Sequence, residues 1–123
     1  MATIDLTAGN FEQTVLDNDI VFVDFWASWC GPCRSFAPIY EAAAEQHGDL
    51  VFASVNTEEE QQLAAAARVS SIPTLMAFKK GALVFSQAGA LPAPALEQVI
   101  TAVRDFDVDA ALAEPEGRPG GDD

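Results

Sequence analysis

The sequence predicts a single α/β domain in which a mostly parallel sheet is covered by helices on both faces. Segments with helical and strand patterns alternate along most of the chain, and two later strand patterns are joined by a short turn, which gives the sheet an antiparallel edge. The 123 residues fit one domain, and half of them are apolar. The chain is therefore long enough to bury a hydrophobic core.

The first predicted elements are a possible strand at residues 3–6 and a short helix after it. Asn10 and Gln13 have the spacing of a capping box, a pattern that typically opens a helix. The apolar residues of this helix share one face: Phe11, Val15 and Leu16.

The next strand and the longest helix flank a pair of cysteines. Residues 20–26 are apolar except for one aspartate, a pattern typical of a strand buried on both faces. After the cysteines, residues at helical spacing precede Gly48, which ends the pattern: Phe36, Tyr40, Ala43 and His47. Pro38 lies inside this pattern and is expected to kink the helix.

The second half of the chain continues the alternation. Residues 50–55 predict a strand, and Thr57 with Glu60 predicts a second capping box and a helix through Arg68. Residues 75–78 and 83–85 flank a turn and predict a hairpin. The last helix, introduced by prolines, carries one apolar stripe: Leu96, Val99, Ile100 and Val103.

A change of composition separates a domain at residues 1–104 from an acidic extension at residues 105–123. The extension holds seven acidic residues against Arg118 alone. Residues 105–112 contain enough apolar side chains to add a last packed turn, whereas residues 114–123 are rich in glycine and proline and are expected to be disordered and solvated.

The charge balance makes some partners unexpected. The chain has 6 Lys+Arg and 19 Asp+Glu, a formal net charge of −13, and its basic residues are scattered, so nucleic acid is not expected as the main partner. No stretch approaches the ~20 apolar residues of a membrane span, and the N-terminus lacks the pattern of a secretory signal. We therefore expect a cytoplasmic protein, and nothing in the sequence demands more than a monomer.

Cys30 and Cys33 form a Cys-X-X-Cys motif between a buried strand and a helix. The helix N-terminus favours an anion, so the Cys30 thiol is expected to ionise more easily than free cysteine and to be exposed. Cys33, one turn further on, is close enough to close a small ring, and Pro32 fits a helix start. This spacing predicts Cys30 as the attacking thiolate and Cys33 as the resolving thiol, through a mixed disulfide.

Other uses of the cysteine pair are weaker. Structural zinc usually takes four ligands, and this chain offers two cysteines and His47, so no metal is expected within one chain, although a metal shared between two chains stays open. A permanent disulfide would stabilise little, because it closes a very short loop. Redox chemistry is the preferred interpretation.

The residues from Val23 to Cys33, Val-Asp-Phe-Trp-Ala-Ser-Trp-Cys-Gly-Pro-Cys, resemble the active-site segment of the thioredoxin family. Ser71-Ile72-Pro73-Thr74 and Gly89-Ala90 lie where that family has its cis-proline loop and its substrate-groove glycine. The resemblance covers roughly residues 3–104. It implies a five-stranded thioredoxin fold and a protein-disulfide reductase with no bound cofactor, which a thioredoxin reductase recharges with electrons from NADPH.

The resemblance also implies a site for extended, disulfide-containing protein substrates. A shallow apolar groove would surround the Cys30 sulfur, formed by Trp29, Gly31, Pro32, Ile72, Pro73, Gly89 and Ala90. X-Pro bonds are cis in only ~5% of cases, so the cis bond before Pro73 is implied by the resemblance alone. The Ile72 backbone would then pair with a substrate strand beside Cys30.

Asp24 is the one charged residue in the central apolar run. Burying an ionised, unpaired carboxylate is costly, so its pKa should rise toward neutrality, which suits a group that takes or delivers the proton of Cys33. The alternative is a structural aspartate satisfied by backbone donors. Family members often have a lysine on the next strand near this aspartate, and this chain has Ser54 there. We therefore predict a high Asp24 pKa and no Asp–Lys pair.

Three other functions stay open on the sequence alone. The chain could be a specialised donor for one reductase or peroxidase, a net oxidant, or a scaffold or holdase in which the thiols are incidental. The Gly31-Pro32 dipeptide favours a reductant by resemblance, but the reduction potential depends on how well the thiolate is stabilised.

Overall fold

β2 (Ile20–Trp26) lies at the centre of a five-stranded sheet in the computed structural model, which describes residues 2–112. The strand order is β1-β3-β2-β4-β5. β1 and β3 run parallel to β2, and β4 is antiparallel to both of its neighbours, so it alone runs in the opposite direction. The predicted α/β sheet with an antiparallel hairpin edge is confirmed. The bounds of the other strands are β1 (Ile4–Asp5), β3 (Val51–Asn56), β4 (Thr74–Lys79) and β5 (Ala82–Ala88).

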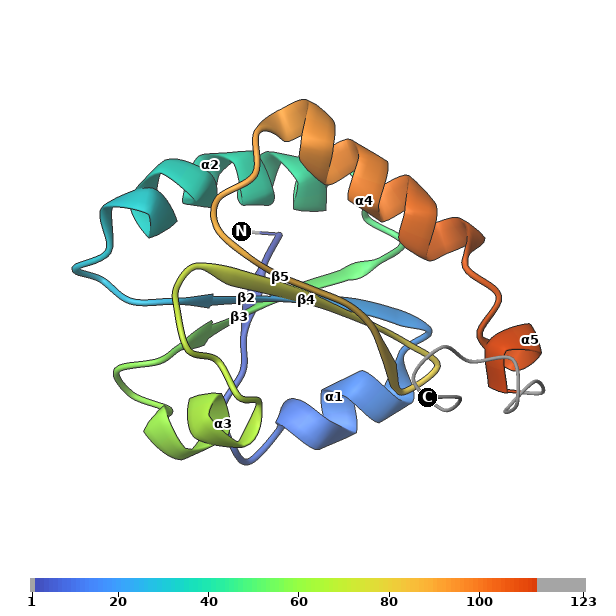
Figure 1. Ribbon diagram of the computed structural model, residues 1–123, viewed down its shortest axis with the longest axis horizontal. Helices are drawn as coiled ribbons and strands as arrows, with labels where there is room; N and C mark the ends of the chain where they lie inside the picture. Colours follow the sequence, from blue (N-terminus) through green and yellow to red (C-terminus); the bar gives the residue numbers. More distant parts are fainter. Residues whose placement is uncertain (1, 113–123) are drawn as a thin grey trace, which may run out of the picture.

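Helices cover both faces of the sheet. α2 (Gly31–Gln46) and α4 (Ala93–Asp105) lie on one face, while α1 (Phe11–Asp17) and α3 (Gln61–Ala66) lie on the other (Figure 1). A short last helix, α5 (Val108–Leu112), follows α4. The active-site segment lies where β2 ends and α2 begins.

Alternation along β2 divides the core into two layers. Ile20 and Phe22 pack with the residues of α2 and α4, whereas Val21, Val23 and Phe25 pack with those of the α1–α3 side. Asp24 follows Phe22 by two residues and therefore faces α2. Within the α2 layer, Phe22 and Phe52 stack with ring centroids 5.1 Å apart.

Both predicted capping boxes are wrong, because the side chains use other partners. The Asn10 Oδ1 accepts a hydrogen bond from the Thr7 amide (2.7 Å) and none from the helix it precedes. The Thr57 hydroxyl donates to the Trp26 carbonyl (3.0 Å), which ties the β3–α3 loop to the end of β2. Leu16, expected on the buried face of α1, is 61% exposed.

The helix predicted through Arg68 is shorter than expected. α3 spans only Gln61–Ala66, and Arg68 has a φ of 62°, a left-handed conformation that cannot continue a helix. The hairpin forms as predicted, with a two-residue turn at Lys80 and Gly81, whose φ values are 53° and 82°. Positive φ at both positions is typical of a type I′ turn, which matches the twist of the strands.

The start of the acidic extension is packed, as the sequence allowed. The Val108 side chain is 3% exposed, and Lys79 of β4 donates hydrogen bonds to the carbonyls of Val103, Arg104 and Phe106. These contacts join α4 and the segment after it to the sheet. The disorder predicted for residues 114–123 lies outside the described residues.

Candidate functional site

A disulfide joins Cys30 to Cys33 at the N-terminus of α2, with the two Cα atoms 5.2 Å apart. Cys30 is the N-cap residue of the helix, and its sulfur accepts a hydrogen bond from the Cys33 amide (3.2 Å). Gly31 and Pro32 occupy the first helical positions, where a proline removes no helical hydrogen bond. The helix start therefore presents amide donors to the Cys30 sulfur, as the sequence predicts.

The sulfur expected to be exposed is largely covered in this oxidised state. Cys30 is 4% exposed and Cys33 is 3% exposed, and both pack in a small apolar cluster with Ala27, Trp26 and Ile72. The Cys30 sulfur also lies 3.8 Å from the Ile72 carbonyl oxygen. The disulfide turns the Cys30 sulfur toward Cys33, and the apolar cluster and the Ile72 carbonyl cover it.

The predicted groove residues lie on loops around that cluster. The Ile72–Pro73 peptide bond is cis, as the resemblance implies. Trp29 is 68% exposed. Gly89 and Ala90, which follow the end of β5, are exposed as well, and Gly89 has a φ of 105°. The Gly89 amide donates to the Pro73 carbonyl (2.8 Å), so the two loops that the resemblance assigned to the groove are in contact.

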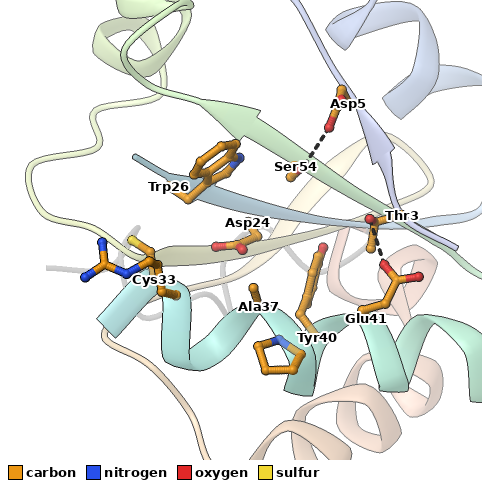
Figure 2. Close-up of a pocket in the computed structure, with 11 residues that line it drawn as sticks. Thr3, Asp5, Asp24, Trp26, Cys33, Ala37, Tyr40, Glu41 and Ser54 are labelled. Atoms are coloured by element: carbon orange, nitrogen blue, oxygen red, sulfur yellow. Dashed lines mark hydrogen bonds between the residues drawn. The ribbon is translucent and has the colours of Figure 1, made fainter. Parts of the chain in front are cut away.

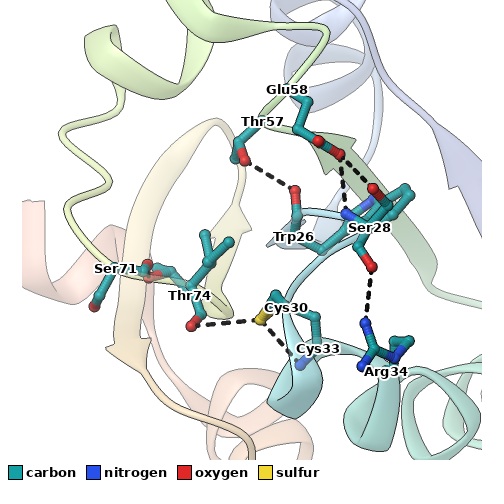
Figure 3. Close-up of a disulfide and its surroundings, with 10 residues drawn as sticks. Trp26, Ser28, Cys30, Cys33, Arg34, Thr57, Glu58, Ser71 and Thr74 are labelled. Atoms are coloured by element: carbon teal, nitrogen blue, oxygen red, sulfur yellow. Dashed lines mark hydrogen bonds between the residues drawn. A yellow bond between two sulfur atoms is a disulfide. The ribbon is translucent and has the colours of Figure 1, made fainter.

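Ser28 is held from two sides in the loop before the cysteines. One carboxylate oxygen of Glu58 accepts hydrogen bonds from the Ser28 amide (3.0 Å) and hydroxyl (2.8 Å), while Arg34 donates to the Ser28 carbonyl (2.9 Å) (Figure 3). The two hydrogen bonds from Ser28 lower the pKa of Glu58, and the bond from the Ser28 amide has the larger effect. This contact could not be predicted from the sequence, because Glu58 and Ser28 are brought together only by the β2–β3 register.

Asp24 lies in the middle of β2, opposite Ser54 of β3 and Leu75 of β4. Its side chain is 5% exposed, and its Oδ1 has no hydrogen-bond partner among the described residues. Burial raises the pKa of Asp24 from 3.8 to about 7, because desolvation penalises the charged form. The high pKa expected from the sequence therefore agrees with the structure, and the backbone donors of the structural alternative do not reach this oxygen.

Ser54, at the position where family members often have a lysine, supplies no positive charge to Asp24, and its side chain bonds elsewhere. The Ser54 hydroxyl donates to Asp5 of β1 (3.1 Å). The nearby Tyr40 hydroxyl donates to the Ala53 carbonyl (2.8 Å). The pKa of Tyr40 is raised above its usual value, first by burial and then by the charge of Asp24. Tyr40 is thus a neutral neighbour of Asp24 at working pH.

Asp24 and Cys33 line the same cavity of about 440 Å³ between the sheet and α2. Figure 2 shows the Asp24 carboxylate between Trp26 and α2, with Cys33 on one side and Tyr40 on the other. This arrangement gives the Cys33 thiol a titratable neighbour that changes charge near neutral pH.

No group of three or more His, Cys, Asp or Glu side chains within residues 2–112 is placed to hold a metal ion. His47, the remaining zinc candidate, contacts Glu97 through Nε2 (2.9 Å) and Arg104 through Nδ1 (3.0 Å) at the far end of α2. Across the same described part of the chain, no helix has both the length and the apolar character needed to cross a bilayer.

Comparison with known proteins gives one consistent result. The family model for thioredoxin matches residues 2–102. A protein named putative thioredoxin 2, from Streptomyces coelicolor, is 51% identical over 122 residues, which cover 97% of this chain and 91% of the relative. Thioredoxin 1 of a Nostoc species is 46% identical over 101 residues, covering 80% of this chain and 94% of the relative.

Solved structures agree with these sequence relatives. A mutant thioredoxin from Halobacterium salinarum superposes with a TM-score of 0.79 at 33% identity, over 85% of this chain and 93% of the other. A Plasmodium falciparum thioredoxin gives a TM-score of 0.75, also at 33% identity, over 80% of this chain and 96% of the other. The matched region holds both cysteines, Asp24 and the cis-proline loop.

Proposed function

The chain belongs to the thioredoxin family and is a protein-disulfide reductase, and from that premise we propose how its residues divide the reaction. The Cys30 thiolate attacks a substrate disulfide and forms a mixed disulfide, releasing one substrate cysteine as a thiolate. Cys33 then attacks the Cys30 sulfur, the second substrate cysteine leaves, and the Cys30–Cys33 disulfide remains. The two electrons thus pass from the enzyme dithiol to the substrate.

The observation that carries this proposal is the place of the disulfide at the start of α2. The Cys33 amide donates to the Cys30 sulfur, and the helix N-terminus favours a negative charge there. After reduction, the same donor stabilises the Cys30 thiolate, which makes Cys30 the better nucleophile near neutral pH. Cys33, inside the first turn, keeps its proton longer.

We assign the proton of Cys33 to Asp24. Asp24 titrates at about pH 7 and lines the same cavity as Cys33, so its carboxylate accepts the thiol proton when Cys33 attacks. It returns the proton when the disulfide is reduced again. The groove for the substrate chain is formed by residues of the loops around Cys30 and of the first turn of α2: Trp29, Gly31, Pro32, Ile72, Pro73, Gly89 and Ala90.

Further features follow as proposals. The donor that reduces Cys30–Cys33 is a thioredoxin reductase with electrons from NADPH, since family members generally work with a reductase and with substrate proteins. The protein works as a monomer in the cytoplasm, a compartment in which protein thiols are kept reduced. Its net charge of −13 makes nucleic acid an unfavourable partner.

The test is to trap the intermediate. Cys33→Ser should accumulate a mixed disulfide through Cys30 when mixed with a disulfide-containing protein such as insulin, whereas Cys30→Ser should form none. The double Cys→Ser variant should reduce no insulin. A double variant that kept its full effect on a client protein would show that binding, as in a scaffold or holdase, is the function; adducts through Cys33 would reverse the assigned roles.

A further inference from the structure

The cavity beside Asp24 is larger than proton transfer to Cys33 requires. Its volume of about 440 Å³ lies within the ~300–1,000 Å³ range of small-molecule sites. It is lined by residues of β2, of β3, of α2 and of the segment near the N-terminus (Figure 2). The lining residues from α2 are Cys33, Arg34, Ala37, Pro38, Tyr40 and Glu41.

The buried oxygen of Asp24 is the unusual feature of this cavity. Oδ1 has no hydrogen-bond partner among the described residues, and the Asp24 side chain is only 5% exposed. A buried acceptor without a donor costs about 1–3 kcal/mol. Ser54, the strand neighbour that could have donated, is bonded to Asp5 instead. Asp24 itself lines the cavity, so its carboxyl group, which has no partner at Oδ1, is the polar group that a ligand there would meet.

The charges at the cavity favour a cation. Asp5 and Glu41 border the cavity and are both carboxylates, and Glu41 accepts bonds from the Ala2 amide and the Thr3 hydroxyl. Arg34 is the one basic residue of the lining, and its guanidinium is bonded to the Ser28 carbonyl. Tyr40 and Cys33 complete the titratable groups, and neither supplies a positive charge.

We propose that this cavity binds a small aliphatic primary ammonium ion, with the ammonium group paired to Asp24 and the alkyl chain packed between Trp26 and α2. An ammonium group is a compact cation with three N–H donors, so it can pair with the Asp24 carboxylate inside a largely apolar cavity. Metal ions are a poorer fit, because no group of three or more ligating side chains is assembled within residues 2–112. The apolar walls require an organic cation.

Binding would change the acid–base behaviour of the active site, a consequence that rests on the role proposed for Asp24. A cation beside the carboxylate favours its charged form, so an occupied site keeps Asp24 ionised at lower pH. A carboxylate paired with a cation is also a weaker base, so an occupied site makes proton transfer from Cys33 to Asp24 less favourable. The ligand thus acts on the resolving step and leaves the Cys30 surface free for the substrate.

The experiment uses n-butylammonium chloride as the probe and the full, oxidised chain. Backbone NMR shifts are followed during titration at pH 7 and at constant ionic strength, with n-butanol as a neutral probe of similar shape. We expect saturable 1:1 shifts centred on Trp26, Ser54 and Tyr40 with butylammonium, and affinity weaker by roughly tenfold or more with butanol.

Two variants test the charge pairing in different ways. Asp24→Asn removes the carboxylate, and Ser54→Lys places an internal ammonium opposite Asp24, so each should weaken butylammonium binding roughly tenfold or more. Glu59→Gln makes the same charge change as Asp24→Asn at an exposed position outside the cavity and should bind as the wild type does. Ser54→Lys keeps the conclusion testable if Asp24→Asn is misfolded.

Three results would overturn the proposal: no saturable binding, equal binding of butanol, or unchanged binding in Asp24→Asn or Ser54→Lys. Failure of the proposed function looks different, because the insulin assay contains no butylammonium and the binding assay needs no reduction. A chain that traps mixed disulfides through Cys30 but binds no butylammonium retains its enzymatic assignment and loses only the cation site.

Discussion

The carboxyl group of Asp24 couples the stability of the protein to pH. Its pKa is about 7 when folded and 3.8 when unfolded, so between these values the folded state holds a proton that the unfolded state has lost. The contribution of Asp24 to stability is therefore fully present below about pH 4 and is lost as the pH rises through 7. The loss amounts to about 4 kcal/mol at most.

We predict that Asp24→Asn is more stable than the wild type at pH 8, with an advantage that shrinks toward pH 5. Asparagine has no charge to bury, so the pH dependence contributed by this position disappears. Urea unfolding of the oxidised proteins from pH 5 to 8 measures the difference, with Glu59→Gln as the exposed control. Parallel curves for wild type and Asp24→Asn would mean that Asp24 does not titrate in this range.

Glu58 acts on the active site through Ser28. Its carboxylate holds the amide and hydroxyl of Ser28, one residue before Trp29 and two before Cys30. We predict that Glu58→Ala lowers kcat/KM for insulin reduction several-fold, mainly through KM, because the loop that carries Trp29 is less well positioned for the substrate. The neighbouring Glu59→Ala is the matched control and should leave both constants unchanged.

Steady-state kinetics above pH 5 are the right measurement, since the Ser28 bonds lower the Glu58 pKa and keep its carboxylate ionised there. Glu58→Gln should recover part of the loss, because an amide oxygen still accepts from Ser28. If Glu58→Ala and Glu59→Ala behave alike, the Ser28 contact does not position the loop.

A lysine side chain from the sheet donates hydrogen bonds to the carbonyl groups at the C-terminus of α4. Lys79 is 8% exposed, and its ammonium group donates to three carbonyls, those of Val103 (2.9 Å), Arg104 (2.6 Å) and Phe106 (2.7 Å). An ammonium group has three donors, so all of them are used. The negative end of the α4 dipole lies at the same place and further favours a cation.

We predict that Lys79→Met lowers the free energy of unfolding by about 2–4 kcal/mol, because three carbonyls lose a charged donor in a largely buried place. Lys80→Met is the matched control: Lys80 pairs with Asp109 at an exposed position, so its removal should leave stability close to that of the wild type. Chemical denaturation of both variants at pH 7 compares them. Similar losses in the two would assign the effect to net charge.

The elements that the sequence predicted well are those set by apolar periodicity. β2 has the predicted bounds, and α4 buries the expected stripe residues Leu96, Ile100 and Val103. The capping boxes failed, because Asn10 bonds to Thr7 in the preceding loop and Thr57 bonds to β2, although α1 does begin directly after Asn10 as predicted. Arg68, predicted as the last residue of the next helix, lies beyond the end of α3 and has a left-handed backbone.

The candidate site also has features that the sequence predicts and features that it does not. The Cys30–Cys33 pair is local, so its spacing and its place before a helix were enough to predict it. The high pKa of Asp24 was also accessible, because an acidic residue in an apolar strand implies burial. Its cavity was not, since that depends on β-strand register, on the Ser54–Asp5 bond and on the packing of α2. The cover over the Cys30 sulfur depends likewise on the distant Ile72 loop.

The folded domain extends beyond the boundary expected at residue 104. Val108 is 3% exposed, and the Phe106 carbonyl accepts from Lys79, so the first part of the acidic extension contributes to the folded domain. The sequence indicated this only as a possible packed turn at residues 105–112, because seven acidic residues dominate the composition of the extension. The functional boundary of the domain should therefore lie near residue 112.

Two shortened chains test this boundary. A chain ending after Leu112 should unfold at the same denaturant concentration as the full protein and reduce insulin at the same rate. A chain ending after Asp105 should lose about 2–4 kcal/mol, because it lacks the Phe106 acceptor and the buried Val108 side chain. Since the new terminal carboxylate could itself pair with Lys79, Val108→Ala in the full chain is the second measurement, with an expected loss of about 2 kcal/mol. Equal stability of all four proteins would place the boundary at 104, and a loss already present in the chain ending after Leu112 would move it further toward the C-terminus.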